Sequence, residues 1–377
     1  MKIDKFVYSV ATLTTTVVGI GIFGIPFSFV KAGFLTGFLF LVGVFIVTLL
    51  SNLMYGEIVL RTKRRYQIVG YVGKYLGRNS RKLVLFSFML VIYGALLAIT
   101  VVSGTFWSHV FFFVNISPTA FSFIFFGLAS AVVLKGLRTA SKVDFVLLSF
   151  FIAVIILMAL FSFSRIEVAN YLTLFQKEFW FLPFGVIMFS FAGVSSVVLV
   201  REILNNDEKR FKKAIIAGTV IPGVIYVVLT LVVVGVSGEL TSPDAISGLG
   251  IFLNPRILFL GSLLGFLSTF TVFINYATAL RESFQYDFGI RKFHAQLLVL
   301  VPPILLFISG LRNFIEIIGL VGAIGISIDI IIIVFAFMAA RKKGDREPEY
   351  SLKIPHWLLY LLVAIFAVGA VYALIFF

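Results

Sequence analysis

The sequence predicts an all-α integral membrane protein with about eleven transmembrane helices. Of its 377 residues, 60% are hydrophobic and only 13% are charged, and the mean hydropathy is +1.11. A soluble domain has an apolar share of about 45 to 50%. The apolar residues recur in runs of about 20, the length of helix that spans a hydrocarbon core, whereas the strands of a membrane barrel are about half as long and alternate in polarity.

Apolar runs and helix breakers define the spans in chain order. We expect them at about residues 6–32, 34–60, 83–113, 118–135, 143–164, 179–201, 213–237, 255–281, 293–310, 313–340 and 356–377. The first span is not followed by a small-residue cleavage site, so we interpret it as a retained helix and not as a signal peptide.

The distribution of Lys and Arg predicts the orientation of the chain. If the N-terminus is cytoplasmic, the only cations left on the outer side, out of 31, are Lys31, Arg165, Lys177, Arg256 and Arg312. The positive-inside rule therefore predicts a cytoplasmic N-terminus and, after eleven spans, an external C-terminus. The short termini and short loops favour a multi-pass protein of the plasma (inner) membrane. The net charge of +14 then reflects this asymmetry, and we expect no nucleic-acid partner.

Two connecting segments are more than simple turns. Residues 68–77 mix apolar and basic side chains, which suits a short helix on the inner membrane surface or a solvated basic loop. The external segment 238–254 contains Pro243 and several glycines and is too long for a tight turn. It is a candidate lid.

The first span is interrupted near its centre. Three glycines and a proline occur between Gly19 and Pro26. Glycine costs a helix about 1 kcal/mol and proline about 3 kcal/mol relative to alanine, so we expect the helix to break here. At membrane depth, exposed backbone groups are tolerated only where they line a cavity, so we predict a ligand site at the break. Glycines can instead let helices approach closely, and we prefer that interpretation for Gly37, Gly322 and Gly325.

The sixth span is interrupted as well, because small and polar residues occupy the middle of the stretch 184–196. The interruptions in spans one and six are five spans apart. Because five is an odd number, a second half of the chain that starts at span six enters the membrane from the side opposite to the first half. We therefore predict a five-plus-five inverted-repeat fold with broken helices 1 and 6. The first repeat would cover residues 1–164 and the second 165–340, and residues 341–377 would add a C-terminal helix.

The breaks suit a zwitterionic ligand. A broken helix offers free N–H groups at a positive dipole end and free carbonyl groups at the other end. An α-amino acid needs both, with its carboxylate on the amides near Ile20–Phe23 and its ammonium on the carbonyls near Val17 and Phe189–Phe191. Other small zwitterions or polar solutes would fit nearly as well.

Several motifs resemble those of the amino acid/auxin permease family, within the amino acid-polyamine-organocation superfamily. The first is Gly19-Ile-Gly-Ile-Phe-Gly-Ile-Pro-Phe followed by Lys31-Ala-Gly-Phe, and it is the most specific. The supporting stretches are Gly56–Arg61, Tyr93–Ala98 and Phe189-Ser-Phe-Ala-Gly with Arg201-Glu202. The resemblance covers most of the chain. It implies the five-plus-five fold with one extra C-terminal helix and ion-coupled secondary transport of amino acids.

The predicted substrate site combines the two breaks with span three. The residues that we expect to bind the substrate are Gly19, Ile20, Gly21, Ile22, Phe23, Tyr93, Phe189, Ser190, Phe191, Ala192 and Gly193. The aromatic members would stack on an aromatic or branched side chain, but the composition does not identify the amino acid.

The resemblance also implies a sodium site between the first break and span eight. The candidate ligands are Thr15, Val18, Ser268, Thr269 and Thr271, which offer the hard oxygen atoms that such a cation prefers. The alternative is ordinary hydrogen bonding between helices. Some proton-coupled relatives place a lysine from span five at this site. The middle of span five has no lysine in this chain, which favours sodium. Relatives that use sodium carry Asn where this chain has Thr15, which argues against sodium. Coupling to sodium or to protons therefore stays open.

Asp329 is a charged residue deep in span ten. An unpaired carboxylate at that depth costs a few kcal/mol, so Asp329 is either a proton relay or the partner of a neighbouring helix.

Composition excludes several function classes. The absence of cysteine excludes disulfides, thiolate metal sites and cysteine nucleophiles. His109, His294 and His356 lie in separate segments without metal-ligand spacing, so we expect neither an enzyme nor a cofactor. The alternative to a transporter is a nutrient sensor subunit that binds an amino acid without moving it. The oligomeric state is not predicted.

Overall fold

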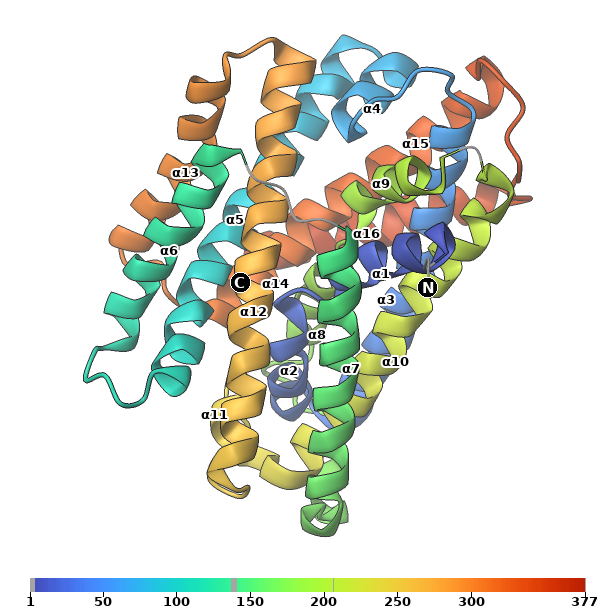
Figure 1. Cartoon of the computed structure of the whole chain (residues 1–377). Coiled ribbons are helices and arrows are strands. Elements are labelled where there is room, and N and C mark those ends of the chain that lie inside the picture. Colours follow the sequence, from blue (N-terminus) through green and yellow to red (C-terminus); the bar gives the residue numbers. More distant parts are fainter. Residues whose placement is uncertain (1–3, 137–140, 206, 377) are drawn as a thin grey trace.

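The computed structural model describes residues 4–136, 141–205 and 207–376, and every regular element within them is a helix (Figure 1). The elements of the first half are α1 (Lys5–Val18), η1 (Gly21–Phe23), α2 (Ile25–Ala32), α3 (Phe34–Leu60), α4 (Ile68–Leu76), α5 (Arg78–Val110), α6 (Pro118–Lys135), α7 (Ser141–Ser162), η2 (Phe163–Arg165) and η3 (Val168–Tyr171). Those of the second half are α8 (Leu182–Ser190), α9 (Val194–Leu204), η4 (Glu208–Arg210), α10 (Phe211–Ser237), η5 (Gly238–Leu240), α11 (Ile246–Leu249), α12 (Pro255–Glu282), η6 (Ser283–Asp287), α13 (Lys292–Ile308), α14 (Phe314–Leu320), η7 (Val321–Ile326), α15 (Ser327–Lys343) and α16 (His356–Phe376).

The predicted spans are confirmed as helices. Within the described ranges, nine helices are long and apolar enough to cross a membrane, and the bent pair α1 and α2 makes a tenth span. The remaining predicted span is α13, a shorter apolar helix. The largest shift of a boundary is at α5, which begins at Arg78 and not at residue 83.

The break in the first span is confirmed. Helix α1 ends at Val18, a single 3-10 turn follows, and α2 continues at an angle of 50°. Gly19 leaves the helical region, with φ 2° and ψ −148°. Pro26 lies in the first turn of α2, where its missing N–H group has no helical partner to lose. The proline therefore starts the second half of the span.

The sixth span is interrupted between Ser190 and Val194, as predicted, but the interruption is milder. Residues Leu182–Leu204 stay straight enough to count as one span. Span ten contains a feature that was not predicted, the π-helical turn η7. A Cβ atom on Gly322 in this turn would overlap the carbonyl oxygen of Gly185 in α8. Gly322 is thus a packing glycine, as expected.

The helices pack in two groups with a cleft between them. The broken spans α1–α2 and α8–α9 pack with α3 and α10, while α5 and α12 pack together with α6 and α13. Helix α7 contacts α1, α10 and α12, and so borders both groups. The structure supports the predicted inverted-repeat fold, while the division at residues 164 and 340 stays a prediction.

The two predicted connecting segments are partly ordered as helices. Residues 68–76 form helix α4, so the first of the two alternatives, a short helix, is the one found. The apolar side of α4 is buried against α5 and α15. In the external segment, Ile246 of α11 packs against Gly261 of α12. The segment therefore covers the end of α12 that faces away from α4 (Figure 1).

Candidate functional site

The two helix breaks lie side by side. A Cβ atom on Gly21 would be only 2.5 Å from the Cα atom of Ser190, so the two backbones touch where they unwind. The predicted residues Gly19–Phe23 and Phe189–Gly193 are all buried except Ala192, which is partly exposed. The structure thus brings together the two stretches that sequence spacing had linked.

Two tyrosines that sequence reasoning missed hold the free carbonyl groups of the breaks. The hydroxyl of Tyr226 in α10 lies 2.6 Å from the carbonyl oxygen of Val17 and 2.6 Å from that of Ser190. The hydroxyl of Tyr276 in α12 donates to the carbonyl of Ala192 at 3.3 Å. A tyrosine within an apolar span needs a hydrogen-bond partner for its hydroxyl, and this requirement could have identified both residues from the sequence. Of the carbonyls predicted to bind an ammonium group, those of Val17 and Ser190 therefore share one internal donor.

Tyr93 does not lie at the breaks. Its hydroxyl donates to the carbonyl of Leu298 in α13 at 2.7 Å. The turn of α5 that reaches the first break carries Phe106, whose ring centroid is 4.7 Å from that of Phe23. The structure therefore directs the hydroxyl of Tyr93 toward α13, because the rotation of α5 about its axis is set by its neighbours and is not visible in a motif. A role of Tyr93 in substrate binding stays a prediction.

A cleft leads from one face of the molecule to the second break. It has a volume of about 320 Å³ and is lined by α1, α7, α9 and α12. At its deep end, Ser195 and Tyr276 also line a small cavity of about 40 Å³ beside residues 191–194. The unwound part of span six is therefore reached from this cleft.

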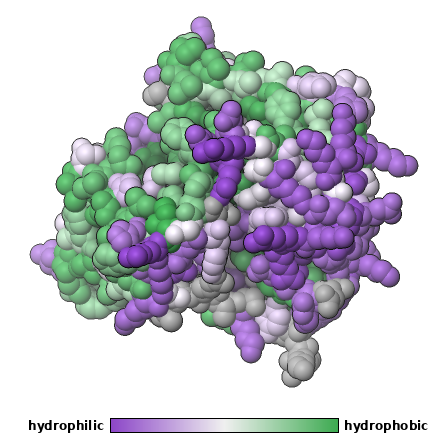
Figure 2. All heavy atoms as spheres, turned by 90° about the horizontal axis from the view of Figure 1, so that it is seen from above, coloured by the Kyte–Doolittle hydropathy of each residue, from purple (hydrophilic) through white to green (hydrophobic). Residues whose placement is uncertain are grey.

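The mouth of the cleft is basic. A basin of about 770 Å³ shares Gln67, Leu199, Glu202 and Glu282 with the cleft. Its cations are Arg64, Arg65, Lys74, Arg78 and Arg81, which come from the α3–α4 loop, α4 and the start of α5. We call this side, at the top of Figure 1, the basic face, and Figure 2 shows a broad hydrophilic area on it.

The opposite side of the breaks is closed. The rings of Phe23 and Phe106 are in contact there, and Phe106 also packs against Gly265 of α12. The pocket on that face, of about 430 Å³, is lined by Phe27 and Lys31 of α2 but by no residue of either break. Within the described residues, the cleft thus connects the second break with the basic face, while Phe23 and Phe106 close the other side.

The candidate sodium ligands are buried or partly buried on α1 and α12. The hydroxyl of Thr15 donates to the carbonyl of Ala11 at 2.8 Å, and that of Thr269 to the carbonyl of Phe266 at 2.8 Å. Thr271 likewise donates to Leu267 of its own helix. Such hydroxyls keep oxygen lone pairs that a cation could use. Val18 and Ser268 are also buried, and the assignment of these residues to sodium stays a prediction.

Asp329 has a neighbouring-helix partner. Ser87 of α5 donates to its carboxylate at 2.7 Å, as one of the two interpretations of this residue requires. Asp329 also lines the small cavity together with Thr48 and Ser51, whose buried hydroxyls make no hydrogen bond to any residue that the structure describes. A role as proton relay stays a prediction.

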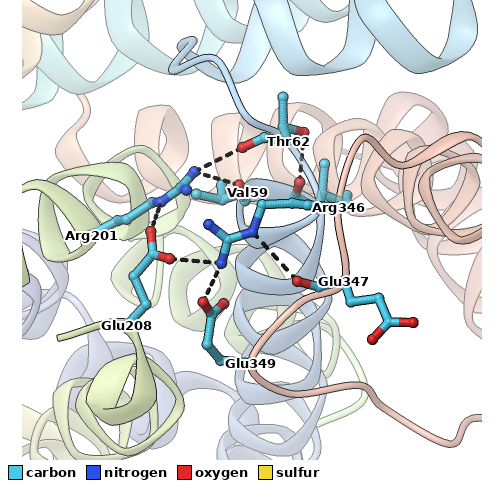
Figure 3. Close-up of polar contacts among 8 residues, drawn as sticks. Val59, Thr62, Arg201, Glu208, Arg346, Glu347 and Glu349 are labelled. Carbon is cyan, nitrogen blue, oxygen red and sulfur yellow. Dashed lines mark hydrogen bonds and ion pairs between the residues drawn. The ribbon is translucent and has the colours of Figure 1, made fainter. Parts of the chain in front are cut away.

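A charged network fastens α9 to the basic face. Glu208 lies between the guanidinium groups of Arg201 and Arg346, at 2.6 and 2.7 Å (Figure 3). Arg201 also donates to the carbonyls of Val59 and Thr62 at the end of α3. A second anchor of the segment that carries Arg346 is Asp345, which pairs with Lys74. The hydrogen bond from Lys74 lowers the pKa of Asp345. The network holds α3, α9 and residues 344–355 together.

The model of the tryptophan/tyrosine permease family matches residues 2–374. The chain belongs to the tryptophan/tyrosine permease family. The permease is similar to Glutamine transporter 2 of Aliivibrio fischeri, with 23% identity over 360 residues and 93% coverage of each chain. Its fold is similar to that of MhsT, crystallised in complex with L-phenylalanine, with a TM-score of 0.68 and 12% identity, over 99% of this chain and 98% of that one.

These similarities agree with the main prediction. The protein is a multi-pass membrane protein of an amino acid permease family, and so a transporter and not an enzyme. The first-helix motif led us to name the amino acid/auxin permease family and its superfamily, and both of these assignments stay predictions.

Proposed function

We propose that the permease is a secondary active transporter that carries a neutral α-amino acid across the plasma membrane by alternating access, driven by a sodium or proton gradient. The observation that carries the proposal is the cleft, which leads from the basic face to the unwound backbone of span six while the other side is closed. A transporter of this kind alternates between such a state and its opposite.

The surroundings of the breaks favour a neutral and preferably aromatic substrate. Phe191 packs edge-on against Tyr226 at a centroid distance of 4.9 Å, and Phe23 and Phe106 close the other side. The family name and the phenylalanine bound to MhsT point the same way, whereas the similarity to a glutamine transporter points to a polar side chain. We place aromatic amino acids first and glutamine second.

The orientation follows from charge. With the basic face in the cytoplasm, the cations of the basin lie on the side that the positive-inside rule requires. The N-terminus would be cytoplasmic, the C-terminus external, and the structure inward-open. Sodium would bind between Thr15, Val18 and span eight, and Asp329 is the candidate relay if protons drive transport.

Uptake into liposomes tests the proposal. The purified protein is reconstituted, and uptake of labelled tryptophan, tyrosine, phenylalanine and glutamine is measured under an imposed sodium or proton gradient. We expect concentrative uptake of at least one of them. Binding without uptake would favour the sensor alternative, and the absence of both would contradict the proposal.

A further inference from the structure

Asp144 is a buried carboxylate that has no cationic partner among the described residues. It lies in the first turn of α7 and is only 3% exposed. Thr12 of α1 donates to its Oδ2 atom at 3.0 Å, while Oδ1 has no hydrogen-bond partner in the described part of the chain. A buried carboxylate without a counter-charge costs several kcal/mol, and the dipole at a helix N-terminus offsets only part of that cost.

The neighbouring helix α12 carries a second polar group of the cleft that has no partner among the described residues. Thr278 of α12 is 7% exposed, and its hydroxyl makes no hydrogen bond with the described residues. Asp144, Thr12 and Thr278 all line the cleft. Buried polar groups in folded proteins usually have a partner, and two that lack one on adjacent helices of the same cleft could bind a ligand there.

The charge of the cleft defines the ligand. Its other ionisable lining residues are Glu202 of α9 and Glu282 of α12, and the described lining contains no Lys, Arg or His. Lys142, on the same helix as Asp144, is exposed and does not line the cleft. Glu282 is paired with Arg281 of its own helix. The groups that line the cleft around Asp144 thus supply hard oxygen atoms, which suits a cation that binds oxygen.

We propose that Asp144, together with the hydroxyls of Thr12 and Thr278, forms an inner binding site for the monovalent cation, sodium ion or proton, that drives transport. The proposal rests on the transport function proposed above and adds a site to it. Thr12 lies one turn before Thr15 on α1, and Thr278 lies beyond Thr269 on α12, toward the basic face. A cation released from the predicted sodium site would reach Asp144 next.

The coupling test separates movement of the amino acid from its driving force. Counterflow measures exchange of labelled amino acid without an ion gradient, and concentrative uptake is measured with a sodium gradient at equal pH or with a pH gradient in sodium-free buffer. We expect Asp144→Asn to retain counterflow and to lose concentrative uptake under the gradient that drives the wild type. Concentrative uptake by Asp144→Asn at the wild-type level would overturn the proposal.

Direct binding keeps the test independent of transport. If sodium is the cation, labelled sodium ions should bind Asp144→Asn at least about tenfold more weakly, as expected for loss of a charged ligand. If it is the proton, the protein should take up one proton fewer between neutral and acidic pH. A wild type that transports nothing would refute the proposed function, and these binding results would still decide the role of Asp144.

Two further variants make the test specific. Glu202→Gln removes one negative charge from the exposed boundary between cleft and basin. Glu202→Gln should keep concentrative uptake. If Glu202→Gln and Asp144→Asn lost concentrative uptake equally, the total negative charge of the cleft and not a specific site at Asp144 would be responsible, and the proposal would be overturned. If Asp144→Asn fails to fold, Thr278→Val removes an unpartnered hydroxyl at nearly constant volume. It should weaken the cation dependence, and wild-type behaviour would overturn the proposal.

Discussion

The hydroxyl of Tyr226 has one hydrogen atom but lies 2.6 Å from two carbonyl oxygens, one from each broken span. The residue is fully enclosed, so water cannot supply a second donor. A single side chain of α10 thus ties together two unwound segments that are far apart in the sequence. At the scale of residues, the site is held by tyrosines as much as by the glycines that create it.

We expect Tyr226→Phe to destabilise the protein by about 1–3 kcal/mol, because the carbonyls of Val17 and Ser190 would be buried without a donor. Thermal unfolding of the purified protein measures the effect, and amino acid binding should weaken with it. Tyr171→Phe is the matched control, since Tyr171 also donates to a carbonyl, that of Leu231, but at a partly exposed position. Equal losses in the two variants would contradict a special role for Tyr226.

At the scale of elements, Glu208 joins two arginines from different parts of the chain. Arg201 belongs to the second half of a broken helix, and Arg346 to the segment between α15 and α16. The contact makes α9 and the segment 344–355 one mechanical unit with the end of α3.

Glu208→Gln should loosen this unit. We expect faster amide hydrogen exchange in residues 344–355, because Arg346 and Arg201 each lose a charged partner, while Arg201 keeps its contacts with the carbonyls of Val59 and Thr62. Mass spectrometry of exchanged peptides checks the result. Glu349→Gln removes a neighbouring carboxylate and leaves Glu208 in place, so it should change exchange much less. A reversed order of the two variants would refute the bridging role.

The sequence predicted what local composition controls. Breakers at Gly19–Pro26 and apolar runs of sufficient length placed the breaks and all the spans. The π-helical turn η7 and the direction of Tyr93 were out of reach, since both depend on how neighbouring helices pack. Tyr226 and Tyr276 lie in spans without a motif. The sequence therefore predicted the backbone segments of the site but not the two tyrosines that donate hydrogen bonds to them.

At the scale of the whole molecule, the absence of cysteine gives a direct test of access. Each introduced cysteine is the only thiol in the chain. Ala279→Cys lines the cleft, and Phe27→Cys lines the pocket on the opposite face. We expect a membrane-impermeant maleimide to label Ala279→Cys from the cytoplasmic side and Phe27→Cys from the outside, in inside-out and right-side-out vesicles respectively. The opposite pattern would overturn the predicted orientation.

Saturating amino acid should change the labelling rate of Ala279→Cys, because substrate shifts an alternating-access equilibrium. The rate at an exposed position away from the cleft, such as Lys343→Cys, should stay constant. An unchanged rate at Ala279→Cys, together with substrate binding, would favour a sensor that does not move.

The contact between Gly185 and Gly322 has a consequence for mutational tolerance. An added methyl group at either position would have to displace backbone, because a Cβ atom there overlaps a carbonyl oxygen of the facing helix. Gly43 of α3 and Gly127 of α6 are also helical, but they have open space around them, so alanine should be neutral or gain up to about 1 kcal/mol in helix propensity. In a library of all single substitutions selected for growth on the transported nutrient, substitutions at Gly185 and Gly322 should be among the least tolerated. Alanine at Gly43 and Gly127 should be tolerated, although these glycines also lie in apolar helical segments.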